Sequence, residues 1–248
     1  MEARLFKSIT ASNKGPYSSF DFTPYLPRRD QPGKWLPGIE RLEVCVVGWH
    51  CVNADNLIYW LDEQIYVVET TGNRIYEDGK YAAQRLRLVR KIETWNPRTQ
   101  RMFACDCADR VLEIYERLHP GDHRPRQAIA VARRYAQGLA GDVELAAARS
   151  NAYHAVFCSD GWTQRKAAEA VLGVVEPNVA RRGSLSTWWA ARDAVWAANR
   201  KLIVDNWGRD NIIVDWHNTA NSALDAETKW QTRRLWQYLE GKIQSPIP

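Results

Sequence analysis

The 248-residue chain changes its pattern abruptly at "TWNPRTQRMF", and this change constrains the fold more than any other feature. Before it, short apolar runs of strand length alternate with loops rich in Pro and Gly. From Asn96 onward the apolar residues recur at helical spacing, and Asn96 followed by Pro97 is a typical helix start. The pattern predicts an α+β protein, with a small β-rich domain over residues 1–95 that holds one short helix, and an α-helical bundle over residues 96–248.

Within the β-rich part, the apolar runs "EARLFKSIT", "LEVCVVG" and "QIYVVETTG" predict strands, and "NADNLIYWLD" predicts the short helix. In "RIYEDGKYAAQRLRLVRKI", Asp78-Gly79 is the signal of a tight hairpin turn. Apolar and basic residues then alternate along the second hairpin strand, so one face should be buried and the other exposed. We expect the exposed face to carry a basic ladder formed by Arg85, Arg87 and Lys91.

The stretch from Cys105 to Leu139, "CDCADRVLEIYERLHPGDHRPRQAIAVARRYAQGL", predicts two helices joined by a turn. The segment "HPGDHRP" supplies what such a turn needs: a helix stop, a flexible Gly, a cap and a Pro start. Cys105 and Cys107 lie two residues apart in the first helix and so point to nearly opposite sides. They cannot chelate one metal ion together, and we interpret them as core thiols.

Cysteine usage and hydropathy indicate the compartment. The five cysteines are odd in number and irregularly spaced, which favours reduced thiols over a disulfide framework. "MEARLFKSIT" has no apolar core segment typical of a signal peptide, and no apolar run approaches the ~18 residues of a membrane span. We therefore expect a cytoplasmic protein without a bound metal, a cofactor or a membrane segment.

The charge and the tryptophans suggest possible partners. Net charge is +5, and Arg supplies most of the basic residues, including the pair Arg181 and Arg182. Arg-rich surfaces bind acidic proteins or nucleic acid, although scattered arginines are often halves of surface ion pairs. Seven of the 12 tryptophans lie between Trp188 and Trp236. Such a cluster is either a rigid core or a stacking surface for single-stranded nucleic acid.

The helical part resembles the immunity proteins of bacterial polymorphic toxin systems. The resemblance lies in the Asp-Cys-Ala start, Tyr115-Glu116, the His-Pro-Gly-Asp turn, the Arg-Pro-Arg that follows it, and Gly138. "ETKWQTRRLWQYL" is similar to the last helix of that family, so the likeness extends roughly from Asn96 to Leu239. The middle differs, because the family has an Ala/His-rich segment where this chain is Trp-rich. The resemblance implies a binding protein, and the name of the family rests mostly on gene neighbourhood.

The β-rich part is similar, in "VVGWHCVNADNLIYWLDEQIYVVE" and "RLRLVRKIETW", to a small bacterial and phage domain. That domain in turn resembles ADP-ribosyltransferase-like folds. This second resemblance implies roles for four residues in an NAD-using enzyme. His50 would hold the nicotinamide ribose, Tyr66 or Tyr81 would stack on the nicotinamide, and Glu69 would polarise the ribose hydroxyl. The competing interpretation is that His50 hydrogen-bonds a backbone carbonyl and only locks a turn.

These observations favour a non-catalytic inhibitor of the immunity type, or of the phage anti-defence (anti-CRISPR-like) type, over an enzyme. The expected partner is another protein, a toxin or a host defence complex with an acidic surface. The expected binding residues are Arg85, Arg87, Lys91, Arg181 and Arg182. An ADP-ribosyltransferase-like enzyme and a nucleic-acid-binding protein that uses Arg and Trp are the two alternatives.

Overall fold

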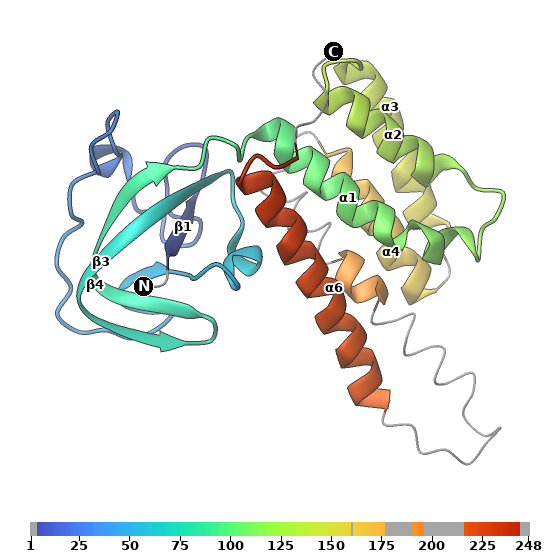
Figure 1. Cartoon of the computed structure of the whole chain (residues 1–248). Helices are drawn as coiled ribbons and strands as arrows, with labels where there is room; N and C mark the ends of the chain where they lie inside the picture. The colour runs from blue at the N-terminus through green and yellow to red at the C-terminus, as the bar shows by residue number, and fades with distance from the viewer. Residues whose placement is uncertain (1–3, 160, 177–189, 196–215, 244–248) are drawn as a thin grey trace. The chain divides into compact units, whose positions relative to one another are not determined.

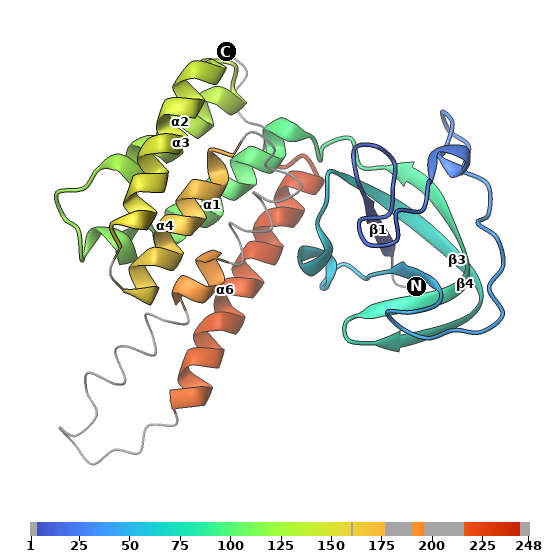
Figure 2. The same ribbon diagram turned by 180° about the vertical axis from the view of Figure 1, so that it is seen from behind.

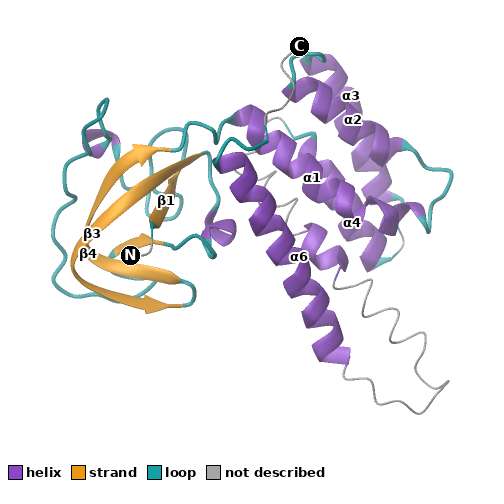
Figure 3. Ribbon diagram, in the orientation of Figure 1, coloured by secondary structure: helices purple, strands orange, loops and turns teal. Residues whose placement is uncertain are grey.

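The computed structural model describes residues 4–159, 161–176, 190–195 and 216–243 (Figure 1). Internal contacts divide the chain into two compact units, residues 1–96 and 97–248. The first unit holds the strands and two short 3-10 helices, and the second unit is built from α-helices (Figure 3). The α+β class predicted from the sequence is confirmed.

The first unit is a four-stranded antiparallel sheet in the order β1-β3-β4-β2. Its strands are β1 (Leu5–Ile9), β2 (Trp49–Cys51), β3 (Gln64–Glu77) and β4 (Lys80–Lys91). The long strands β3 and β4 form the predicted hairpin, with Asp78 and Gly79 at its turn. Both turn residues have positive φ, 49° and 77°, as a type I′ turn requires.

The sheet curls until its two edge strands meet. Phe6 of β1 and Val52, which follows β2, exchange both backbone hydrogen bonds, at 2.8 and 2.9 Å. Residues 33–39 run beside the remaining edge of β4, where the backbone amides of Gly33, Leu36 and Ile39 donate to carbonyls of that strand. The unit is therefore a small closed barrel, which leaves few unpaired strand edges.

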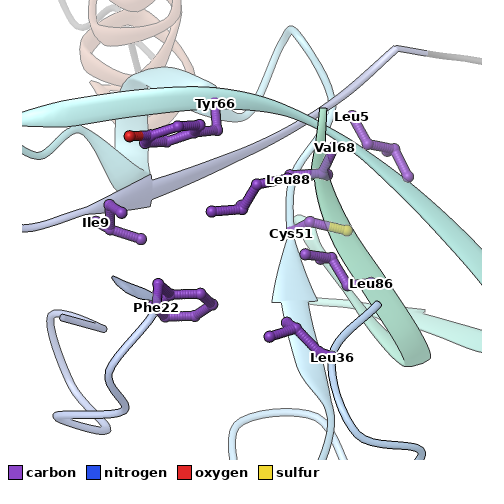
Figure 4. Close-up of a cluster of buried hydrophobic side chains, with 9 residues drawn as sticks. All are labelled: Leu5, Ile9, Phe22, Leu36, Cys51, Tyr66, Val68, Leu86 and Leu88. Carbon is purple, nitrogen blue, oxygen red and sulfur yellow. The ribbon is translucent and has the colours of Figure 1, made fainter. Parts of the chain in front are cut away.

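The barrel encloses a hydrophobic core (Figure 4). Its residues come from all four strands, from the loop before β2 and from the segment beside β4: Leu5, Ile9, Phe22, Leu36, Cys51, Tyr66, Val68, Leu86 and Leu88. Trp95 is also buried, and its ring N–H donates to the carbonyl of Asp62 at 2.8 Å. Trp95 therefore holds the C-terminal end of this unit in place, because its ring is buried and its N–H is hydrogen-bonded there.

Two expectations for this unit are corrected. "LEVCVVG" is not a buried strand but a tight turn, closed by a bridge between Glu43 and Val47, and Val46 is 66% exposed. An apolar run alone does not distinguish a strand from a loop, and here Cys45 adopts a positive φ of 69°. The expected short helix is a single 3-10 turn, η2 (Leu57–Trp60), and a second one is η1 (Thr23–Tyr25).

The described part of the second unit includes helices α1 (Pro97–Glu116), α2 (Arg124–Ala136), α3 (Asp142–Phe157), α4 (Trp162–Val174) and α6 (Trp216–Leu239) (Figure 2). Helix α1 packs against α2, α4 and α6, while α3 packs against α2 and α4. Because α1 has neighbours on several sides, nine consecutive residues from Gln100 to Ala108 are buried. None of the described helices has an apolar stretch long enough to cross a lipid bilayer.

A lysine lies against the core of the barrel. Lys7 of β1 pairs with Tyr66 of β3, so its side chain shares the face of a core residue. Its Nζ donates to the carbonyl oxygen of His50 at 2.9 Å and lies 5.2 Å from the centre of the Phe22 ring. Burial lowers the pKa of the Lys7 amine to about 8, because the charged form loses its hydration.

Lys7→Met should change the dependence of stability on pH. The pKa of Lys7 is about 8 in the folded protein and 10.5 in the unfolded chain. Between these two pH values the folded protein therefore binds fewer protons than the unfolded chain. Stability relative to Lys7→Met should therefore rise as pH increases from 8 to 10.5. Urea unfolding of both proteins across this range measures the difference, and Lys14→Met, at an exposed lysine, is the control. A constant difference would show that Lys7 keeps an ordinary pKa.

Candidate functional site

The histidine expected to hold a substrate instead closes a turn. The ring Nε2 of His50 accepts a hydrogen bond from the backbone N–H of Cys45 at 3.0 Å. The pKa of His50 is lowered by burial and by the positive charges of Lys7 and Lys80, which keeps the ring in the neutral, accepting form. The competing interpretation from the sequence, a histidine that locks a turn, agrees with this geometry in part, because the ring binds the backbone N–H of Cys45 and not the backbone carbonyl that was expected.

The other residues of the transferase hypothesis are not brought to one site. Tyr66 and Glu69 stand on opposite faces of β3: Tyr66 is in the core, and Glu69 pairs with Arg87 on the outside. Tyr81, on β4, packs against the core, and the centre of its ring lies 4.7 Å from the centre of the Tyr76 ring. The thiol of Cys51 is buried and has its pKa raised to about 11, so it is a poor nucleophile at neutral pH.

Strand β4 does carry a row of basic residues on its outer face, but not all of them are the residues that the sequence predicted. A bulge at Val89 shifts the register, so that Arg90 pairs with Val67 and Lys91 pairs with Tyr66. Paired residues share a face, which places Lys91 on the core side and Arg90 beside Arg87. The expectation that Lys91 faces solvent with Arg85 and Arg87 is therefore corrected. We call Arg85, Arg87 and Arg90 the β4 arginine face.

The three arginines of this face differ in how free their charges are. Arg87 forms an ion pair with Glu69 at 2.5 Å, and its guanidinium lies 4.7 Å from the Trp35 ring centre. Arg85 and Arg90 are exposed. Arg85 also lines an open groove of about 620 Å³, together with Gly38, Ile39, Glu40, Thr71, Gly72 and Gln84. A partner with a carboxylate or phosphate could bind Arg85 there, whereas Arg87 is already neutralised.

Two further expectations lie outside the described residues. Arg181 and Arg182 cannot be placed, and neither can most of the tryptophans between Trp188 and Trp236. Of that cluster, Trp230 is described in α6, where the guanidinium of Arg110 lies 4.4 Å from its ring centre. This tryptophan packs against a helix of its own unit and so does not test the stacking-surface interpretation.

The sequence reading missed Asp106, the residue that joins three helices. Its carboxylate accepts hydrogen bonds from Arg234 Nε at 2.7 Å and from the Tyr238 hydroxyl at 2.6 Å, both on α6. It also forms an ion pair at 2.9 Å with Arg133 of α2. Asp106 itself lies on α1 and is buried. The signal that could have identified Asp106 was an acidic residue among the apolar residues of a helix. A buried carboxylate of this kind requires a partner of opposite charge.

A second polar link joins α1 to α6. Glu227 is almost fully buried, and one of its carboxylate oxygens pairs with Arg110 of α1 at 2.7 Å. The other oxygen accepts a hydrogen bond from Gln231 at 3.0 Å. These residues lie in the "ETKWQTRRLWQYL" segment, so this segment connects α6 to α1 through buried polar contacts as well as through apolar packing.

The turn between α1 and α2 is locked by one carboxylate. Asp122 accepts a 2.5 Å hydrogen bond from the Tyr115 hydroxyl and two from the guanidinium of Arg124. It also accepts a hydrogen bond from the backbone N–H of Arg124, in the first turn of α2. The Arg124 hydrogen bonds hold the pKa of Asp122 well below its ordinary value. The "HPGDHRP" segment therefore sets the geometry of a helical hairpin, as its sequence predicts.

The cysteines of this hairpin are both buried, although they point to different sides of α1. Burial raises the pKa of the Cys105 thiol to about 12 and raises that of Cys107 as well. All five cysteines of the chain are free. Among the described residues, no three His, Cys, Asp or Glu side chains are grouped closely enough to hold a metal ion.

Asp106→Asn should destabilise the helical unit by about 3 kcal/mol or more, because Arg133 and Arg234 lose the charge that compensates them. Asp109→Asn is a matched control on the same helix. Asp109 also pairs with Arg133, but its side chain is 44% exposed, so its loss should cost about 1 kcal/mol or less. Chemical denaturation of both variants measures the two costs. Equal small losses would mean that the buried carboxylate does not hold the bundle together.

Comparison with known proteins gives one match. Residues 90–179 match the family model described as Imm-5 like putative immunity protein. A search of curated proteins returned no match, and neither did a search of solved structures. The matched residues run from the end of β4 through α4 and include Asp106, Asp122 and the helical hairpin. The family match therefore supports the immunity-protein family for this stretch of the chain, about a third of its length.

Proposed function

We propose that this chain is a non-catalytic inhibitor of the immunity type, which binds a toxin protein and blocks the toxin by covering part of its surface. The observation that carries the proposal is the match of residues 90–179 to an immunity-protein family. The matched residues form four of the helices and the contacts between them. A rigid helical scaffold of this kind presents surfaces to a partner.

The roles of the motif residues support a binding function. Asp106, Tyr115 and Asp122 all carry the resemblance to the family, and all use their polar groups within the bundle. A catalytic group must reach a substrate, whereas these side chains bridge one helix to another. The motif therefore accounts for a shared scaffold and leaves recognition to the exposed surface.

The β4 arginine face is our candidate for the contact with an acidic part of the toxin. Arg85 and Arg90 are exposed, and Arg85 lines the open groove beside residues 38–40. Exposed basic groups steer an acidic partner and raise the association rate, an effect that weakens with salt. Arg181 and Arg182 are proposed to add to the same recognition.

Co-expression tests the proposal. Each protein encoded beside the gene for this chain is expressed in turn from an inducible promoter to identify a toxin, with this chain or with an empty vector. We expect growth to be restored only when the chain is present, and the two purified proteins to form a stable complex. Continued growth arrest, with no complex formed by the purified proteins, would rule out the immunity function.

A titration distinguishes a binding inhibitor from an enzyme. A binding inhibitor should silence the toxin only as its concentration approaches that of the toxin, whereas an enzyme that modifies the toxin should act at far lower amounts. Toxin activity measured against increasing inhibitor concentration gives the result. Full protection at a small fraction of the toxin concentration, dependent on added NAD, would instead favour the transferase alternative.

Charge reversal tests the β4 arginine face. Arg85→Glu combined with Arg90→Glu should weaken toxin binding by about tenfold or more, mainly through a slower, salt-dependent association. Lys14→Glu is the matched control, since it reverses an exposed charge in the same unit at a residue that is not part of this face. Surface plasmon resonance at two salt concentrations measures the rates. Identical rates for the two proteins would leave the arginines as ordinary surface.

A further inference from the structure

Helix α3 has an apolar face that takes no part in its packing against α2 and α4, the described helices that it contacts. The helix contacts α2 and α4 through one narrow stripe, formed by Leu145, Ala148, Ala152 and Ala155. These residues recur every three or four positions, so they lie along one side of the helix. The rest of α3 is exposed or partly exposed.

The side opposite this stripe is also apolar. It is formed by Val143, Ala146, Ala147, Ser150, Tyr153 and Phe157, which recur at the same helical spacing, and His154 lies among them. Val143 is 84% exposed, Tyr153 59% and Phe157 76%. The face contains no Asp, Glu, Lys or Arg over its four turns. Solvent-facing sides of helices normally carry charge, so a continuous apolar face of this kind marks an interaction surface.

The sizes of the side chains along this face differ between its two halves. The N-terminal half carries small residues, Val143, Ala146 and Ala147, while the C-terminal half carries the rings of Tyr153 and Phe157. Ser150 lies midway. Two such helices packed antiparallel about Ser150 would place the large half of each on the small half of the other. Parallel packing would instead set ring against ring.

We infer that this face binds a second copy of the chain, with α3 packed antiparallel on α3 about a two-fold axis near Ser150. In this arrangement Phe157 of each copy lies opposite Val143 of the other. A two-fold interface uses the same patch on both subunits and therefore requires such self-complementarity. The antiparallel arrangement also sets opposite helix dipoles side by side.

A groove beside α3 extends from the small half of the face to Tyr153 and offers room for side chains of the second copy. It measures about 550 Å³ and runs along α3 between α2 and α4. Its lining is mixed and consists of Tyr135, Asp142, Leu145, Ala146, Arg149, Ser150, Tyr153, Leu172 and Val175. Phe157 of the second copy is opposite this end of α3 and is exposed in its own subunit. An aromatic ring that fills a groove with apolar residues in its lining, here Leu145, Leu172 and Val175, is a common anchor of a protein interface.

The charged residues at the edges of the face would not oppose the pairing. Glu144 forms an ion pair with Arg134, and Arg149 forms one with Glu176, in each case within one copy. Beyond the two ends of α3 lie Leu139, 50% exposed, and Trp162, 60% exposed. The antiparallel arrangement brings Leu139 of one copy to the end where Trp162 of the other lies, which extends the apolar contact.

Sedimentation velocity over a concentration series tests the dimer. The full chain should sediment as a dimer that dissociates on dilution, and Phe157→Glu should weaken the association by at least about 30-fold, as loss of an interface anchor does. Val46→Glu is the control, because it adds the same charge at an apolar residue that is 66% exposed and belongs to the other unit. Circular dichroism confirms that both variants are folded.

A charge pair tests the antiparallel register. Val143→Lys and Phe157→Glu should each give a monomer when alone. In each variant the new charge faces an apolar side chain of the second copy, so the apolar contact is lost. Mixing the two variants should give a heterodimer by native mass spectrometry, since Lys at 143 faces Glu at 157 of the other copy. A wild-type monomer at all concentrations, or a mixture without heterodimer, would overturn the inference.

The inference does not rest on the toxin-binding proposal, and the two fail separately. Toxin protection measured with Phe157→Glu should persist if α3 serves only the second copy. Loss of protection in a protein that is monomeric from the start would contradict the dimer and assign the α3 face to the toxin.

Discussion

The helical unit depends on one buried carboxylate. Asp106 of α1 binds Arg133 of α2 and both Arg234 and Tyr238 of α6, so three helices share a single negative charge. Apolar packing alone tolerates sliding of one helix along another, whereas a buried charge tolerates only the arrangement that compensates it. The second pair, between Glu227 and Arg110, joins α1 to α6 again. The register of the bundle is therefore set by polar contacts inside an apolar core.

A backbone constraint shapes the first unit in a similar way. The sheet closes because Phe6 and Val52 hydrogen-bond across its two edges, and the long β3–β4 hairpin must coil to allow this. The bulge at Val89 follows the same demand. The bulge changes the chemistry of the outer face, because it places Arg90 there in place of Lys91. Which basic residues a partner could reach is thus decided by barrel closure.

The residues that carry the resemblance to immunity proteins mostly build the scaffold. Asp122 locks the turn of the helical hairpin with Tyr115 and Arg124, and Asp106 joins the helices. Recognition is then left to surfaces that such motifs do not specify, and the β4 arginine face and the apolar face of α3 are the two that we propose. A family motif of this kind can be shared by proteins that bind different partners, since the scaffold and the contact surface vary independently.

The sequence by itself determined the local features. The change at Asn96-Pro97, the Asp78-Gly79 turn and the helical hairpin around "HPGDHRP" each depend on nearby residues, so their patterns predicted the structure. Only the tertiary structure decided the rest. "LEVCVVG" forms a turn because the barrel closes elsewhere, and Tyr66 and Glu69 fall on opposite faces of one strand. Asp106 finds its partners 27 and 128 residues away along the chain. Contacts over such separations depend on how the helices pack, which a local pattern does not encode.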